Sequence, residues 1–313
     1  MDLVTLGETL VCLTGQEAGR LETVRTFRKS IGGAESNTAI GLARLGLRST
    51  WLSRASTDGF GAEILKVLRG EGVDVDGVVR GTQPTGLMVK ERRAPGDIHV
   101  HYYRHGSAAA HLDADDLDPA RITAARRLHV TGVTLALGEG PRRAVRRAVE
   151  IAAAAGLPIS FDPNLRLKLW TVDEAVRACR ELFPYVTDLL CNEQEALLLT
   201  GTDDLEASVE TLVGLGFPTV VVKRGEFGAI GHRDGDVVHQ EARPVQAVDS
   251  VGAGDAFNAG YLYGQLTDLS FKRSLEVGNW AASHVVAHTG DYEGFPSLDD
   301  YRTWVDQDVE VTR

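Results

Sequence analysis

The stretch with the clearest chemical potential is DSVGAGDAFNAGYLYG, at residues 249–264. Gly252 and Gly254 stand on either side of Ala253, so the backbone can turn tightly there without a bulky side chain in the way. Small and apolar residues then recur at helical spacing from Ala256 onward. A glycine turn that opens a helix directs unpaired N–H groups and the positive end of the helix dipole at one point. The pattern therefore predicts a binding place for an anion such as a phosphoryl group.

Asp255 falls in the first turn of this predicted helix. An acid at such a position most often only interacts favourably with the helix dipole. Beside an anion-binding turn it can also accept a proton from an attacking hydroxyl, while the amides stabilise the charge on the transferred phosphoryl group. We therefore predict Asp255 as a general base and the turn of Gly252, Ala253 and Gly254 as its anion hole. At Gly254 we expect close approach of the phosphate and a backbone conformation with positive φ.

Two stretches of this sequence resemble the two signatures of one enzyme family. DSVGAGD resembles the carboxy-terminal signature D-T-x-G-A-G-D of the ribokinase-like (PfkB) carbohydrate kinases, with Ser250 in place of the usual Thr. GGAESNTAIGLARLG, at residues 32–46, resembles their amino-terminal signature. A bare Gly-Gly would indicate only a turn, but the resemblance implies that Gly32 and Gly33 let a sugar approach the backbone and that Asn37 hydrogen-bonds a hydroxyl. It also implies ATP and Mg²⁺ as cofactors and leaves a monovalent cation open.

Regular alternation of strand and helix patterns begins near residue 127. Strands are predicted at 50–55, 128–135, 158–161, 189–191 and 219–222, helices at 141–155, 172–183, 193–200 and 205–215, and hairpins over 86–104 and 230–242. Short connections of this kind predict an α/β fold with a mostly parallel central sheet and helices on both faces. We therefore predict one ribokinase-like domain over residues 1–313. The resemblance adds a small, discontinuous β-sheet lid over the sugar, drawn from about residues 10–30 and 85–110.

The carboxyl ends of the predicted strands are where a ligand binds in such a sheet. Asn192 and Glu195 have the spacing of a helix N-cap and its capping-box partner. The resemblance also implies that Glu195 acts on Mg²⁺ through water, and the two interpretations are compatible. KRGEFG, at residues 223–228, resembles the family's glycine turn beside the nucleotide and is not a Walker A loop. The implied ATP contacts are Asn164, Arg166, Asn192, Lys223, Arg224, Gly225, Gly228, Gly252, Gly254 and Asn279.

Three segments resemble those of 2-keto-3-deoxygluconate kinases within this family: FDPNLRLKLW (161–170), HYYRHGSA (101–108) and Gly290-Asp291-Tyr292. Arg104 and Arg166 would suit a carboxylate, because each guanidinium can bind one with two hydrogen bonds. Arg166 could instead, or also, contact ATP phosphates. Met88 departs from the resemblance, since an aromatic residue is expected there. The implied sugar contacts are Gly32, Gly33, Asn37, Met88, Tyr102, Arg104, Arg166, Asp255 and Asp291.

The expected reaction is therefore ATP-dependent phosphorylation of the sugar acid 2-keto-3-deoxygluconate to 2-keto-3-deoxy-6-phosphogluconate. One alternative is a fructokinase or another neutral-sugar kinase of the same family. The other is a catalytically silent regulator that binds a sugar or a nucleotide, which the presence of Asp255 and Glu195 argues against.

Composition limits the remaining possibilities. The 313 residues carry a net charge of −11, which argues against binding to nucleic acid or to a membrane surface. The first residues lack a basic region and no apolar run of about 18 residues occurs, so neither a signal peptide nor a membrane span is expected. The three cysteines are scattered, which is typical of reduced thiols in a cytoplasmic protein. Exposed edges of the lid strands favour a homo-oligomer.

Overall fold

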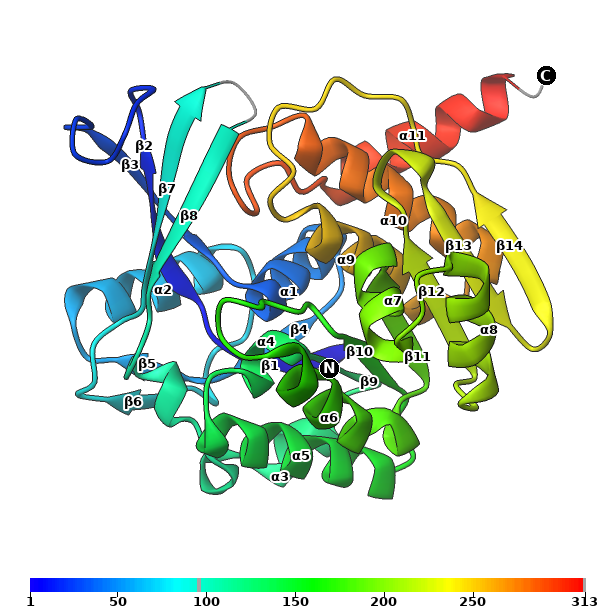
Figure 1. Cartoon of the computed structure of the whole chain (residues 1–313), viewed down its shortest axis with the longest axis horizontal. Coiled ribbons are helices and arrows are strands. Elements are labelled where there is room, and N and C mark those ends of the chain that lie inside the picture. Colours follow the sequence, from blue (N-terminus) through cyan, green and yellow to red (C-terminus); the bar gives the residue numbers. More distant parts are fainter. Residues whose placement is uncertain (95–96, 312–313) are drawn as a thin grey trace.

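An eight-stranded sheet forms the centre of the molecule (Figure 1). The computed structural model describes residues 1–94 and 97–311, and all statements of structure concern these residues. The strand order is β14-β13-β12-β11-β10-β9-β1-β4, parallel from β12 to β4 and antiparallel from β12 to β14. The strands are β1 (Leu3–Leu6), β4 (Ser49–Leu52), β9 (Arg127–Thr131), β10 (Ile159–Asp162), β11 (Asp188–Asn192), β12 (Thr219–Lys223), β13 (Ala229–Arg233) and β14 (Asp236–Gln240).

Helices cover both faces of this sheet, which confirms the predicted fold class. The helices are α1 (Ala34–Arg44), α2 (Gly59–Gly70), α3 (Pro119–Thr123), α4 (Gly132–Leu135), α5 (Glu139–Ala154), α6 (Val172–Leu182), α7 (Glu193–Thr200), α8 (Leu205–Gly214), α9 (Ala253–Leu266), α10 (Phe271–Val286) and α11 (Leu298–Val311). One apolar core packs α5, α6 and α8 against the sheet. A second core packs α1, α9, α10 and α11 against the other side. Helix α9, which carries the glycine turn, is thereby held between the sheet and α10.

A separate four-stranded sheet stands beside this body, drawn in blue and cyan in Figure 1. It consists of β3 (Phe27–Gly32), β2 (Leu10–Gly15), β7 (Leu87–Ala94) and β8 (Asp97–Tyr103), in that order. The hairpin predicted over 86–104 is confirmed by β7 and β8, but the centre of its turn lies outside the described residues. A two-stranded pair, β5 (Arg54–Ser56) and β6 (Val79–Gly81), completes the strands. We refer to the four-stranded sheet as the lid sheet, and its closure over a substrate stays a prediction.

Two of the predicted strands end earlier than expected. The apolar run 128–135 is a strand only to Thr131, and Gly132–Leu135 forms α4. A short buried apolar run does not distinguish a strand from a buried helix turn, so periodicity could not locate this boundary. The predicted strand 50–55 is likewise divided between β4 and β5. The second hairpin is confirmed, and Asp234 and Gly235 both have positive φ at its turn.

Among residues 1–94 and 97–311, no helix is both long and apolar enough to cross a bilayer.

Candidate active site

The glycine turn before α9 is held by its own chain. Gly252 is the N-cap of α9 and has a left-handed backbone, with φ 82°. A Cβ atom on Gly252 would lie 2.1 Å from the carbonyl oxygen of Asp291, so no other residue fits there without movement. Just before the turn, a carboxylate oxygen of Asp249 accepts a hydrogen bond from the Val251 N–H at 3.0 Å. The turn is thus fixed on both sides, and the Ala253 N–H donates to the carbonyl of Ser250 at 3.3 Å.

The conformation predicted for Gly254 is wrong, because positive φ occurs at Gly252 and not at Gly254. Gly254 lies within the first turn of α9 and has an ordinary helical backbone. Outside its own helix, the nearest atom to a Cβ on Gly254 would be Nζ of Lys223, at 3.7 Å. Outside its own helix, an alanine side chain at Gly254 would therefore make only this ordinary van der Waals contact with the Lys223 ammonium.

Asp255 is buried in the first turn of α9, with 8% of its surface exposed. Its carboxylate accepts a hydrogen bond of 2.8 Å from the side-chain amide of Asn37 on α1. Burial raises the pKa of Asp255 to about 7, with Asp162 adding to the rise and Asn37, Arg166 and Lys223 opposing it. A carboxyl group that titrates near neutral pH is well matched to accepting a proton from a hydroxyl.

A charged pair lies directly beneath the turn. Lys223, at the end of β12, donates to the carboxylate of Asp162 at 2.7 Å and to the side-chain oxygen of Asn258 at 3.2 Å. Asn258 also donates to Asp162, at 2.6 Å. Burial alone would raise the pKa of Asp162, but the Lys223 ammonium and these hydrogen bonds hold it below its usual range. Sequence reasoning assigned no role to Asp162 or Asn258, although Asp162 ends a parallel strand, where functional residues gather.

Asn192 and Glu195 form the capping box that their spacing predicts. The Asn192 side chain accepts the Glu195 N–H, and the Glu195 carboxylate accepts the Asn192 N–H, both at 2.9 Å. The other Glu195 oxygen accepts the N–H of Leu165 at 2.8 Å. Burial and the nearby Asp162 raise the pKa of Glu195. Each oxygen keeps a second lone pair, so Glu195 can still accept a hydrogen bond from a water molecule.

Gly32 and Gly33 pack tightly against protein atoms. A Cβ on Gly32 would lie 2.1 Å from a carboxylate oxygen of Asp291, and one on Gly33 would lie 2.2 Å from the carbonyl of Glu8. Gly33 is the N-cap of α1, and its N–H donates to the side-chain oxygen of Asn37 at 3.4 Å. Asn37 thus connects this glycine pair to Asp255, and both glycines are required by packing whatever else they contact.

Arg104, at the end of β8, already has a charged partner. Its Nε donates to the carboxylate of Glu8 at 2.6 Å, and both side chains are buried. Ser107 donates to the same carboxylate. Glu8 was not among the predicted site residues, because nothing in the sequence connects it to a residue 96 positions away. The Cζ atom of Arg104 lies over the Tyr102 ring, 5.6 Å from the ring centre. Both side chains line a cavity of about 750 Å³.

Met88 and Tyr102 face each other across β7 and β8. Met88 is buried with Leu10 and Cys12, so the inner side of the lid sheet is apolar at this place. A thioether fills such a place in the way an aromatic ring would, but with more rotational freedom.

Arg166 differs from Arg104. Its side chain is exposed on the loop after β10, and the described part of the chain gives it no hydrogen bond or ion pair. It is close enough to Asp255 to lower the pKa of that carboxyl. Asn164, in the same loop, has positive φ and donates its N–H to Asp162 at 3.1 Å. Arg166 is thus a cation available to a ligand beside the predicted base.

The remaining predicted nucleotide contacts surround the turn after β12. Arg224 donates to Glu193 at 2.7 Å, while Gly225 and Gly228 both have positive φ. A Cβ on Gly228 would lie 2.0 Å from the carbonyl of Gln240, so this position also requires glycine. Asn279 on α10 donates to the carbonyls of Gln240 and Glu241 at 3.0 and 3.1 Å, which fixes the segment that leads from β14 toward α9.

The fold and this arrangement define a class of protein: an α/β protein with a glycine turn that opens a helix, a buried carboxyl and several cations at the carboxyl ends of its strands. The sequence pattern of the pfkB family carbohydrate kinases matches residues 1–298. The chain belongs to this family and is a sugar kinase.

Three relatives illustrate the similarity. The 2-dehydro-3-deoxygluconokinase of Bacillus subtilis (strain 168) is 36% identical over 310 residues, covering 95% of this chain and 93% of the relative. The 2-dehydro-3-deoxygalactonokinase of Haloferax volcanii is 34% identical over 266 residues, covering 83% of each chain. The crystal structure of a putative ribokinase II from E. coli, in complex with ATP and Mg²⁺, has a TM-score of 0.91 at 26% identity, covering 98% of this chain and 99% of that one.

The two glycines of the turn should respond differently to alanine. Gly252→Ala should lower the free energy of unfolding by at least ~2 kcal/mol, because it combines a left-handed backbone with a clash against Asp291. Gly254→Ala should stay within ~1 kcal/mol of the wild type, because outside its own helix its Cβ makes only an ordinary van der Waals contact with Lys223, yet it should lose activity. Urea unfolding and initial rates of ADP formation measure both effects. Equal loss of stability in the two variants would contradict this account of the turn.

The raised pKa of Asp255 predicts two pH dependences. The value of kcat/KM should rise with pH and level off above about 7, because only the ionised carboxylate can accept a proton.

The Asp255 carboxyl keeps its proton to higher pH in the native state than in the unfolded chain. Its contribution to the free energy of unfolding should therefore decrease as the pH rises from about 4 to about 7. Asp255→Asn removes the titrating carboxyl. The free energy of unfolding of this variant should therefore increase relative to that of the wild type as the pH rises over this range. Its kcat should fall by at least ~10²-fold.

Proposed function

We propose that this sugar kinase transfers the γ-phosphoryl group of ATP to the 6-hydroxyl of 2-keto-3-deoxygluconate, the compound also called 2-dehydro-3-deoxygluconate. The observation that carries the mechanism is Asp255, a buried carboxyl with a pKa of about 7 at the first turn of α9. It accepts the proton of the attacking hydroxyl. Asn37 holds the carboxylate in place, and the amides of the Gly252–Gly254 turn stabilise the charge on the transferred group.

The residues at the strand ends fit a nucleotide with its metal ion. Gly254 presents no side chain at the turn, the Lys223 ammonium would lie 3.7 Å from a Cβ there, and the exposed Arg166 is close enough to act on Asp255. Bound Mg²⁺ neutralises negative charge on the phosphates. In our proposal Glu195 holds a water molecule of that ion, since its second lone pairs remain free. Arg224, Gly225, Gly228 and Asn279 shape the place of the nucleotide by fixing the segments on either side of it.

The choice of substrate is supported by the relatives and by the cations of the site. Two relatives at 34–36% identity are named for 2-dehydro-3-deoxy sugar acids. Arg166 has an exposed guanidinium close to the base, and Arg104 with Tyr102 borders a cavity that Lys168 and Leu169, from the same loop as Arg166, also line. In our proposal the substrate carboxylate binds Arg104 and Arg166, and Asp291 binds hydroxyls from the opposite end. The gluconate and galactonate forms differ in configuration at a single carbon. One of the two relatives is named for the gluconate form and the other for the galactonate form.

One observation favours a neutral ketose such as fructose as a second candidate. Glu8 balances the charge of Arg104, so this guanidinium is less attractive to a substrate carboxylate than a lone arginine would be. Arg104 can still donate from its remaining N–H groups, because a guanidinium has five. The two candidates therefore differ in whether Arg104 contributes to binding of an acid specifically.

A comparison of acceptors decides between them. The wild type should phosphorylate 2-keto-3-deoxygluconate far better than fructose or ribose, because a site with charged donors rejects a ligand that leaves them unpaired, by up to ~10⁴-fold. Arg104→Leu should raise the KM for the acid by roughly 10²-fold and leave the KM for ATP unchanged. The measurements are initial-rate series with each acceptor, including the galactonate epimer.

Arg104→Leu also leaves Glu8 buried without its partner, so the test needs a second variant. Arg104→Leu combined with Glu8→Gln removes both charges and should recover stability but not affinity for the acid. Arg143→Leu is a suitable control, because Arg143 forms an exposed ion pair with Asp113. No preference for the acid in the wild type, or equal harm to both kinds of sugar in the Arg104 variants, would favour the neutral-sugar candidate.

A further inference from the structure

Lys90 is a charged side chain buried in the lid sheet. It lies on β7 and is 1% exposed, which places it among the largest fully buried side chains of the described residues. Its ammonium donates a hydrogen bond to the carboxylate of Asp291 and lies 3.9 Å from a carboxylate oxygen of Asp249. Burial alone would lower the pKa of Lys90, but Asp291 raises it above its usual range. The side chain is therefore an ammonium ion between two acids that come from separate loops.

Both acids shape the glycine turn. Asp249 accepts the Val251 N–H with its side chain, and its own N–H donates to the carbonyl of Val286 at 3.3 Å. The backbone carbonyl of Asp291 packs against Cα of Gly252, close enough that a Cβ there would lie at 2.1 Å. One ammonium on a lid strand thus connects the residue that precedes the turn with the residue that packs against it.

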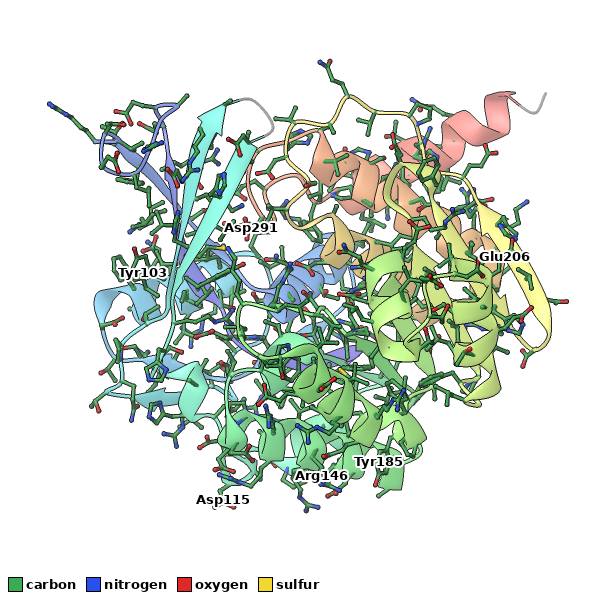
Figure 2. The ribbon with its side chains drawn as sticks, viewed as in Figure 1. Tyr103, Asp115, Arg146, Tyr185, Glu206 and Asp291 are labelled. Atoms are coloured by element: carbon green, nitrogen blue, oxygen red, sulfur yellow. The ribbon has the colours of Figure 1, made fainter. Side chains whose placement is uncertain are left out.

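The positions of these groups can be followed in the figures. Figure 2 labels Asp291 on the side of the lid sheet that faces the rest of the chain, and Tyr103 on the other side. Lys90 and Met88 are two residues apart on β7 and therefore share a face, the one on which Met88 packs with Cys12. A cavity of about 570 Å³ adjoins Lys90 and Asp249, between the lid sheet and the loops around residues 247–249 and 289–293.

Stability alone gives no reason for such an arrangement. An apolar side chain of similar size commonly stabilises a buried site as well as an ion pair does, because desolvation of the charges offsets their attraction. A buried ammonium does supply a specific geometry, since it must stay close to both of its acidic partners. Here those partners, Asp249 and Asp291, belong to the two loops that meet at Gly252.

We propose that Lys90 is a positioning residue for phosphoryl transfer: its ammonium joins the lid sheet to the loops of Asp249 and Asp291 and thereby holds the anion-hole turn in its working geometry. This inference rests on the proposed role of the Gly252–Gly254 turn. It predicts that the turn depends on a residue of the lid sheet which needs no contact with either substrate.

The test is Lys90→Met, an apolar change of similar length. It should lower kcat by about 10²-fold, the cost of displacing reacting groups by roughly 1 Å, with KM for ATP changed by less than about 3-fold. Methylammonium, which can enter through the adjoining cavity, should restore kcat by at least ~10-fold, whereas tetramethylammonium is too large to take the place of the lost ammonium. Lys90→Arg should keep more activity than Lys90→Met. Lys29→Met is the control, because Lys29 lies on the same sheet and pairs with Glu63 at the surface.

If Lys90→Met does not fold, the double variant Lys90→Met with Asp291→Asn decides, since it leaves fewer unpaired charges buried. The proposal expects this variant to fold and to lose kcat by at least ~10-fold relative to the single variant Asp291→Asn, which carries any loss due to Asp291 itself. A folded Lys90→Met with kcat within about 3-fold of the wild type, or one that methylammonium does not rescue, would overturn it. So would a double variant that still fails to fold, which would show that Lys90 serves the fold. Rates are measured with whichever sugar the wild type phosphorylates, so failure of the substrate proposal remains a separate result.

Discussion

The structure is governed by the need to compensate carboxylates that are buried at the carboxyl ends of the strands. A buried charge is costly unless it is paired and hydrogen-bonded. Asp162, at the carboxyl end of β10, is paired with Lys223 and Asn258, and Asp188, at the amino end of β11, is paired in the same way with Arg127. Asp255 is compensated less well, because among the described residues one neutral amide, from Asn37, is its hydrogen-bond donor. Glu195 and Glu35 likewise have only neutral donors among these residues, and burial raises the pKa of all three acids.

A raised pKa does not identify a catalytic group by itself, as Glu35 demonstrates. Burial raises the pKa of Glu35 to about 7 as well, against the effect of hydrogen bonds from Thr131 and Thr134. Its side chain packs against Gly7, where a Cβ would lie 2.2 Å away, and so it fills the junction between α1 and the first strands. Asp255 differs by its position, in the first turn of a helix that opens with the glycine turn. Geometry and pKa together make the case for Asp255, and neither does so separately.

The sequence was most informative where function depends on local geometry. The capping box of Asn192 and Glu195 and the hairpin at Asp234-Gly235 follow from spacing over a few residues, and both are confirmed. The left-handed backbone was predicted at Gly254 but occurs at Gly252. Both glycines of GAGD can adopt it, and the packing of Gly252 against Asp291 determines which one does.

Pairings between distant residues were beyond such reasoning. Glu8 and Arg104 are 96 positions apart, and Lys90 and Asp291 are 201 apart. No periodicity or local motif connects such residues, and burial, which makes their pairing necessary, becomes visible only once the lid sheet is packed against the body. The family resemblance predicted the fold class correctly, while the roles of individual residues at the site remain proposals that rest on the geometry described above.

The central claim is that burial keeps the Asp255 carboxyl close to half ionised at neutral pH, so that it can accept a proton and release it again. A carboxyl titration by ¹³C NMR on aspartate-labelled protein, with the Asp255→Asn variant used to assign the signal, measures this directly. The account predicts a midpoint near 7 in the enzyme without ligands. A midpoint close to 3.8, the usual value for an aspartate, would contradict it, because the carboxylate would then be compensated by contacts that the structure does not show.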